Sequence, residues 1–122
     1  MSYPLPAASC IASVQAHASA VLVCLRGEID IATAPDITDY LDTLTYAGSA
    51  DLLIDLRQVQ FMDGSGVRVL TRARARVQGE GRLRLICTAP VLLQLLRHPS
   101  LQLWFDILDH LPPPVDPPQA AA

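Results

Sequence analysis

The chain has 122 residues, of which 51% are hydrophobic, and it carries a formal charge of -3 at pH 7, with arginine supplying all nine cations. This length predicts one domain that buries roughly two thirds of its unfolded surface and folds without disulfides. The acidic balance argues against a nucleic-acid binder that relies on contacts with phosphate. We find no apolar run near the ~20 residues of a membrane span and no leader pattern at the start, so we expect a cytoplasmic protein.

The three cysteines are odd in number and lack C-x-x-C spacing, which favours neither a disulfide framework nor a zinc site. Cys10, Cys24 and Cys87 all lie in apolar runs, so we expect buried reduced thiols. His17 and His98 have no second ligand at a useful spacing and are expected in turns or at the surface. The sequence therefore indicates no metal site and no cofactor.

The first half of the chain predicts a hairpin and a helix. Residues 10–16 alternate in polarity, residues 17–19 suit a turn, and residues 20–26 are apolar, which is typical of an antiparallel hairpin. Thr33 then stands where it can cap a helix, with proline in the first turn and Asp36 as the acceptor of a capping box. We expect this helix to end near Gly48.

The second half predicts alternating strands and helices. We expect strands at 52–56 and 83–87, helices from the intervening loop to about residue 78 and from 88 to before 99, and a short last strand at 103–108. Such alternation predicts an α/β fold with a mixed, mostly parallel sheet and helices packed against it. We place a flexible arm at 1–8, one domain at 9–110 and a Pro-rich disordered tail at 111–122.

The most informative segment is the loop with the sequence F-M-D-G-S-G-V at residues 61–67, between a predicted strand and a predicted helix. Gly64 and Gly66 let the backbone turn sharply, and Ser65 at the helix entrance can accept a hydrogen bond from a first-turn amide. A helix start also tolerates phosphate, and the carboxyl end of a strand is where such sheets meet their ligands.

This loop and its surroundings resemble the STAS domain of bacterial anti-sigma factor antagonists. The resemblance spans roughly residues 10–109 and rests on two segments, which are residues 53–67 with the D-G-S-G loop, and residues 27–34 with G-E-I-D followed by Thr33 and Ala34. It implies a STAS-like single domain with a mixed, mostly parallel sheet and an N-terminal hairpin.

The resemblance also implies a non-enzymatic regulator. A partner anti-sigma factor serine kinase would phosphorylate Ser65 with ATP, whereas the unphosphorylated protein would capture the anti-sigma factor and free sigma. A phosphatase is a second implied partner. Phosphate adds about 1.5 to 2 negative charges, which at an interface should lower partner affinity without changing the fold. The expected partner-binding residues are Asp30, Thr33, Asp63, Gly64, Gly66, Arg68 and Arg72.

Three positions depart from the family pattern. Gly64 replaces the first hydroxyl of the loop, Arg68 stands where a small residue is usual, and Ser100 replaces a common glycine. Arginine recurs every four residues from Arg68 through Arg72 to residue 76, which predicts an exposed basic stripe that is either a solvated face or a contact for an acidic partner. The aspartates at 36, 39 and 42 are expected on a solvated helix face.

Three alternatives stay open at this point. Ser65 could be a plain helix cap. The chain could be a constitutive STAS-like scaffold subunit, as in lipid-transport ATPase complexes, whose loop docks without switching. The order Ser65, Asp106, His110 also matches a hydrolase triad, although G-S-G is not the G-x-S-x-G elbow of that fold. No phosphate-binding loop of the G-x-x-x-x-G-K type is present, so the sequence favours a protein that is not an enzyme.

Overall fold

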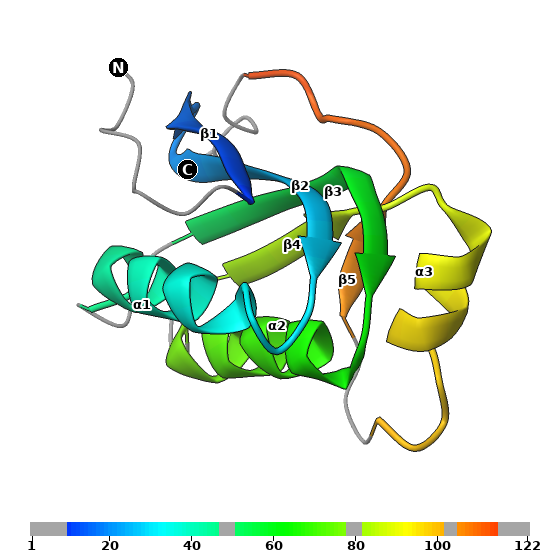
Figure 1. The fold of residues 1–122 in the computed structure, drawn as a ribbon. Coiled ribbons are helices and arrows are strands. Elements are labelled where there is room, and N and C mark those ends of the chain that lie inside the picture. Colours follow the sequence, from blue (N-terminus) through cyan, green and yellow to red (C-terminus); the bar gives the residue numbers. More distant parts are fainter. Residues whose placement is uncertain (1–9, 47–50, 78–81, 102–104, 115–122) are drawn as a thin grey trace.

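The computed structural model describes residues 10–46, 51–77, 82–101 and 105–114. Five strands form one sheet in the order of the chain, β1 (Ile11–His17), β2 (Ala20–Ile29), β3 (Asp51–Met62), β4 (Arg82–Ile86) and β5 (Asp106–Leu108) (Figure 1). The first pair is antiparallel and the other three pairs are parallel. The expected mixed, mostly parallel sheet with an N-terminal hairpin is confirmed.

Three helices, α1 (Ala34–Leu44), α2 (Gly64–Arg76) and α3 (Pro90–Leu96), connect the parallel strands. In Figure 1, α1 and α2 lie side by side along the sheet, while α3 stands beyond β5. All three contribute to the main core, which includes the fully buried Ile37 of α1 and Leu70 of α2 together with Val23 and Ile54 of the sheet. The apolar side chains recur at helical spacing, so each helix turns one face to the strands.

Strand β3 is longer than expected, because it continues past residue 56 to Met62. Its second half stays paired with β2, where Gly27 lies opposite Val59 and Ile29 lies opposite Met62. The pairing shifts register between Cys24 and Arg26 and again between Gly27 and Glu28, and Gly27 has a φ of 78°, a conformation that glycine adopts without strain. The extension carries the loop after β3 to the end of β2, where the Asp63 amide donates to the Ile29 carbonyl at 3.3 Å.

Helix α1 does not begin with the expected capping box. Thr33 occupies the N-cap position, but its side chain makes no capping hydrogen bond, since it bonds back to the preceding turn. The helix ends at Leu44, and Gly48 lies outside the described residues. Helix α2 ends at Arg76, with its C-cap at Val77. Residue 78, where we expected this helix to end, also lies outside the described residues.

The opposite face of the sheet carries a smaller cluster of Leu22, Leu53 and Ile86, against which Leu111 packs. His17, expected in a turn or at the surface, is 9% exposed, and its Nε2 donates to the Pro112 carbonyl at 2.7 Å. Residues 111–114 belong to the segment predicted from the sequence to be a Pro-rich disordered tail. The packed part of the chain therefore extends at least to Pro112.

Cys10 and Cys87 are buried and Cys24 is half-buried, and all three are free thiols. Across the described ranges, no helix is long and apolar enough to cross a membrane. Within the same ranges, no group of three or more acidic, histidine or cysteine side chains is arranged to hold a metal ion.

Candidate functional site

Asp63, rather than Ser65, caps helix α2. The Asp63 Oδ1 accepts a hydrogen bond from the Ser65 amide at 2.8 Å, and the Asp63 carbonyl accepts from the Val67 amide. Aspartate is among the strongest N-caps, and its charge is favoured by the helix dipole. Ser65 is therefore the second residue of the helix, and the prediction that it acts as a plain cap is wrong.

Because Asp63 supplies the cap of α2, the Ser65 hydroxyl is not needed for it. Ser65 is half-buried, and its Oγ makes no hydrogen bond within the described part of the chain. Two neighbouring hydroxyls differ, since Thr33 Oγ1 donates to the Glu28 carbonyl at 3.0 Å and Thr71 Oγ1 donates to the Val67 carbonyl at 2.9 Å. Modification of either threonine would break a bond of the fold, whereas modification of Ser65 would not.

The two loop glycines do different things. A Cβ added at Gly66 would lie 2.3 Å from Met62 Cγ and 3.1 Å from Ile29 Cγ2, so only glycine lets α2 approach the ends of β2 and β3 this closely. A Cβ at Gly64 would have no heavy atom within 4 Å. Gly66 is thus a packing requirement, while Gly64 is an open surface position.

Ser65 faces a groove between α1 and α2, of about 740 Å³. Arg68 and Arg72 line it from α2, while Asp39 lines it from α1. Ile31, which is 80% exposed, stands at its edge in the turn before α1. The structure therefore brings Ser65, Arg68 and Arg72 together beside an exposed apolar side chain, which is a composition suited to a protein partner.

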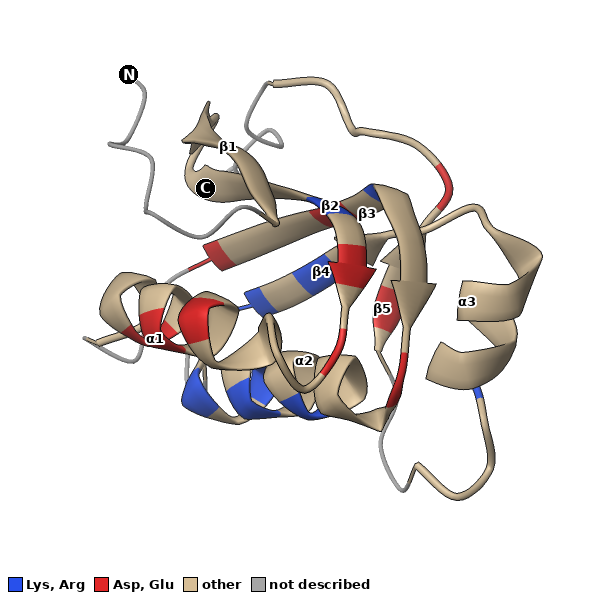
Figure 2. Cartoon of the chain, in the orientation of Figure 1, with Lys and Arg blue, Asp and Glu red and all other residues tan. Residues whose placement is uncertain are grey.

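The arginine stripe on α2 is divided by an acidic residue of α1. Arg72 forms a two-pronged ion pair with Asp42 at 2.9 and 2.8 Å, and Arg76 Nε lies 3.2 Å from the same carboxylate. Figure 2 shows the acidic bands of α1 beside the basic bands of α2. The hydrogen bonds and charge of Arg72 hold the pKa of Asp42 below its usual value. We expected Asp42 on a solvated helix face, but its ion pairs join α1 to α2.

Arg68 is the exception in the stripe. It is exposed, and within the described residues it forms neither a hydrogen bond nor an ion pair. Only this arginine, the nearest of the three to Ser65 in the sequence, is available to a new partner.

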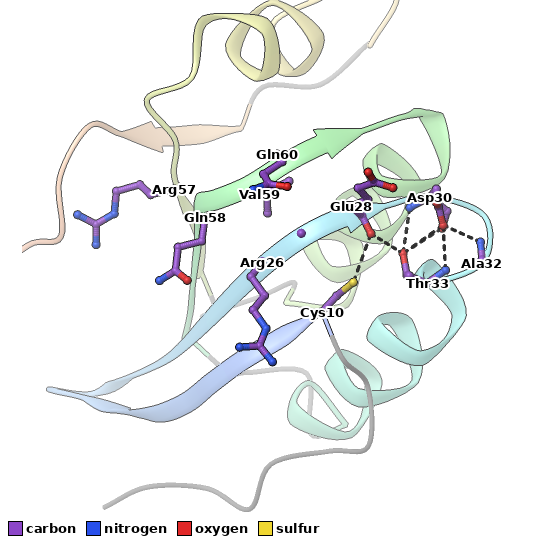
Figure 3. A pocket seen from close by; sticks show the side chains of 11 residues that line it. Cys10, Arg26, Glu28, Asp30, Ala32, Thr33, Arg57, Gln58, Val59 and Gln60 are labelled. Atoms are coloured by element: carbon purple, nitrogen blue, oxygen red, sulfur yellow. Dashed lines mark hydrogen bonds between the residues drawn. The ribbon is translucent and has the colours of Figure 1, made fainter.

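Asp30 and Thr33 hold the turn between β2 and α1 (Figure 3). Asp30 Oδ1 accepts from the amides of Ala32 and Thr33 at 2.9 and 3.2 Å, while Thr33 Oγ1 accepts from the Asp30 amide at 3.0 Å. The turn lies between the groove and a second, polar cleft of about 790 Å³, which Asp30 and Thr33 line together with Glu28. Both residues flank Ile31 at the groove, but Asp30 Oδ1 and Thr33 Oγ1 are already used in the turn and in the bond to the Glu28 carbonyl.

The hydrolase triad finds no support in this arrangement. His110 Nδ1 contacts Asp109 Oδ1 at 2.6 Å, and Asp106 lies in β5 opposite Arg84. Within the described ranges, neither Asp106 nor His110 hydrogen-bonds to Ser65.

The model of the STAS domain family matches residues 12–112, which is most of the chain and includes the described Leu111 and Pro112. The chain belongs to the STAS domain family. No curated protein matches it.

Solved structures agree with this family assignment. An anti-sigma factor antagonist from Mycobacterium paratuberculosis is 25% identical, with a TM-score of 0.72, over 80% of this chain and 84% of that one. The anti-sigma factor antagonist SpoIIAA in its unphosphorylated form is 20% identical, with a TM-score of 0.64, over 81% and 90%. The Bacillus SpoIIAA structure in the phosphorylated form is 22% identical, with a TM-score of 0.58, over 75% and 84%. The STAS fold described above is therefore shared with anti-sigma factor antagonists at low identity.

One charged pair of this STAS domain was missed from the sequence. Asp55 is 6% exposed in β3 and binds Arg57 Nη2 at 2.8 Å. Burial acts to raise the pKa of Asp55, but the hydrogen bonds and charge of Arg57, with a smaller contribution from Cys24, lower it overall. Residues two apart in a strand share a face, so the spacing D-x-R in an apolar strand was the available signal.

Proposed function

We propose that this STAS domain is an anti-sigma factor antagonist that binds an anti-sigma factor serine kinase and is inactivated by phosphorylation of Ser65. The observation that carries the proposal is the half-buried hydroxyl of Ser65, which makes no hydrogen bond within the described residues, in a loop whose helix cap is supplied by Asp63. The likeness to antagonists solved in both unphosphorylated and phosphorylated forms supports it.

The domain contributes only the nucleophile to this reaction. Ser65 Oγ attacks the γ-phosphorus of ATP bound to the kinase, a new O–P bond forms, and the bond between that phosphorus and the bridging oxygen breaks to release ADP. The hydroxyl proton passes to a base on the kinase. The phosphate brings about 1.5 to 2 negative charges to the start of α2, where the helix dipole favours them, so the fold is retained.

The proposed docking surface is the groove beside Ser65. Ile31 supplies exposed apolar area, Arg68 supplies an unpaired cation, Asp63 and Gly66 fix the loop, and Gly64 leaves its surface open. A phosphate in this interface loses its hydration when the kinase binds, which costs free energy. It also repels any acidic group of the kinase that faces Arg68, so the affinity for the kinase falls. Asp30, Thr33 and Arg72 support this surface from its edges. We place this exchange in the cytoplasm, with a phosphatase restoring the active form.

Intact mass spectrometry tests the proposal. The purified protein is incubated with its cognate kinase and ATP, alongside Ser65→Ala and, as a control, Ser100→Ala at a serine that is exposed and distant in the sequence. We expect one added phosphate on wild type and Ser100→Ala and none on Ser65→Ala. Absence of phosphate on wild type with a kinase that binds it refutes the switch.

A second measurement separates the switch from a scaffold. Ser65→Asp should weaken kinase binding at least tenfold while its thermal unfolding stays within a few degrees of wild type. If Ser65→Asp and wild type bind a partner equally well, the loop docks without switching, as in a constitutive scaffold subunit.

A further inference from the structure

We propose that Arg68 binds the phosphate of phosphorylated Ser65 within the same chain. Modification then has two effects on the docking surface, because it adds negative charge and withdraws the one free arginine of the α2 stripe. The inference rests on the proposed phosphorylation of Ser65, and it concerns how that modification is read.

The spacing along α2 sets up this contact. Ser65 and Arg68 are three residues apart in one helix, so they lie on one face with Cβ atoms about 5 to 6 Å apart. Side chains of a helix lean toward its N-terminus, so a long side chain at position 68 covers the turn that contains Ser65. Both residues line the same groove. The planar guanidinium of arginine can offer two N–H donors to a phosphate at this range.

The other charged groups around the groove leave Arg68 to this role. Arg72 and Arg76 are held by Asp42. Asp63 uses its Oδ1 to cap the Ser65 amide. Asp39 lines the groove from α1, but within the described residues it forms no ion pair with Arg68. A phosphate on Ser65 therefore meets one uncommitted cation, on its own helix.

The position next to Arg68 is also open. Gly64 lies four residues before Arg68, and a Cβ placed there would have no heavy atom within 4 Å. No side chain at position 64 occupies the space between the guanidinium and the phosphate. The space beside Arg68 toward the start of α2 is thus open.

Phosphorus NMR tests the clamp on the full chain with phosphoserine incorporated at position 65 during synthesis, so that no kinase is needed. A nearby cation favours the dianion and lowers the second pKa of the phosphate, which is ordinarily about 6. We expect Arg68→Gln to raise that pKa by about 0.2 to 0.7 units, the range of an exposed ion pair. The control is Arg74→Gln, which removes the same charge from an exposed position outside the groove and should leave the pKa unchanged.

Two outcomes overturn the clamp. Either the phosphate pKa is the same in wild type and Arg68→Gln, or both arginine substitutions raise it equally, which would reflect net charge alone. Neither outcome bears on whether a kinase modifies Ser65, because the phosphate is installed without one. Conversely, if no kinase phosphorylates Ser65, the phosphate titration can still be carried out and interpreted. The two proposals are therefore tested independently.

Discussion

The two glycines of the serine loop should respond in opposite ways to alanine. At position 66 the new Cβ would lie 2.3 Å from Met62 Cγ, and Met62 is itself only 7% exposed between β3 and α2. Overpacking of this kind costs about 1 to 3 kcal/mol. At position 64 the new Cβ meets nothing within 4 Å. Both changes bring a similar gain in helix propensity, up to about 1 kcal/mol, so that gain cancels when the two variants are compared.

The difference between Gly64→Ala and Gly66→Ala should therefore be about 1 to 3 kcal/mol in the free energy of unfolding, in favour of Gly64→Ala. Urea denaturation followed by circular dichroism measures it, with the slope of each transition confirming that the denatured states are comparable. Gly64→Ala is expected at or slightly above wild type. If the two variants unfold at the same urea concentration, α2 does not approach the strand ends as closely as described, and the different roles assigned to the two glycines are wrong.

Three further changes test the cap of α2, the ion pair between α1 and α2, and the charged pair in β3. Asp63→Ala removes the cap of α2 and should cost about 1 kcal/mol by urea denaturation; an unchanged midpoint would reassign the cap. Asp42→Ala releases Arg72, so it should cost about 1 kcal/mol or less, and the loss should shrink in high salt; a loss that is independent of salt would contradict the ion pair. Because the pKa of Asp55 is lowered from its ordinary 3.8, the stability that Arg57 adds is present above that pH and is lost as pH falls through the lower, folded value. Arg57→Ala should thus be less stable than wild type at pH 7, with the gap narrowing below about pH 4; a constant gap would refute the linkage.

The fold was predictable because the apolar pattern and the loop agreed. A buried strand, a glycine-flanked serine and a helical repeat follow one another at residues 52–77, and the structure has β3 and α2 there. The full length of β3 was not predictable. Its second half contains exposed glutamines among its apolar residues and is held by pairing with β2. That pairing depends on contacts far apart in the sequence, which local periodicity does not carry.

The cap and the ion pairs were less accessible to sequence reasoning. Asp63 and Ser65 are both good N-caps, and the first helical residue cannot be fixed within one or two positions from a pattern. The face of α2 that carries the arginines was foreseen, but the partner of Arg72 depends on how α1 packs against α2. Composition likewise indicated disorder beyond residue 110, yet Leu111 has an apolar cluster to cover, and the Pro112 carbonyl accepts from the buried His17.

The two departures from the family pattern in the loop belong to one face of one helix. Gly64 and Arg68 are four residues apart, so the position that lost its hydroxyl is the neighbour of the position that gained a cation. Packing does not explain the glycine, because a larger side chain would meet no heavy atom there. The proposed clamp accounts for it, since a bare position 64 leaves open the path from an arginine that leans toward the start of the helix to Ser65. Under the proposed clamp, the departures at Gly64 and Arg68 would act together on the charge around a single hydroxyl.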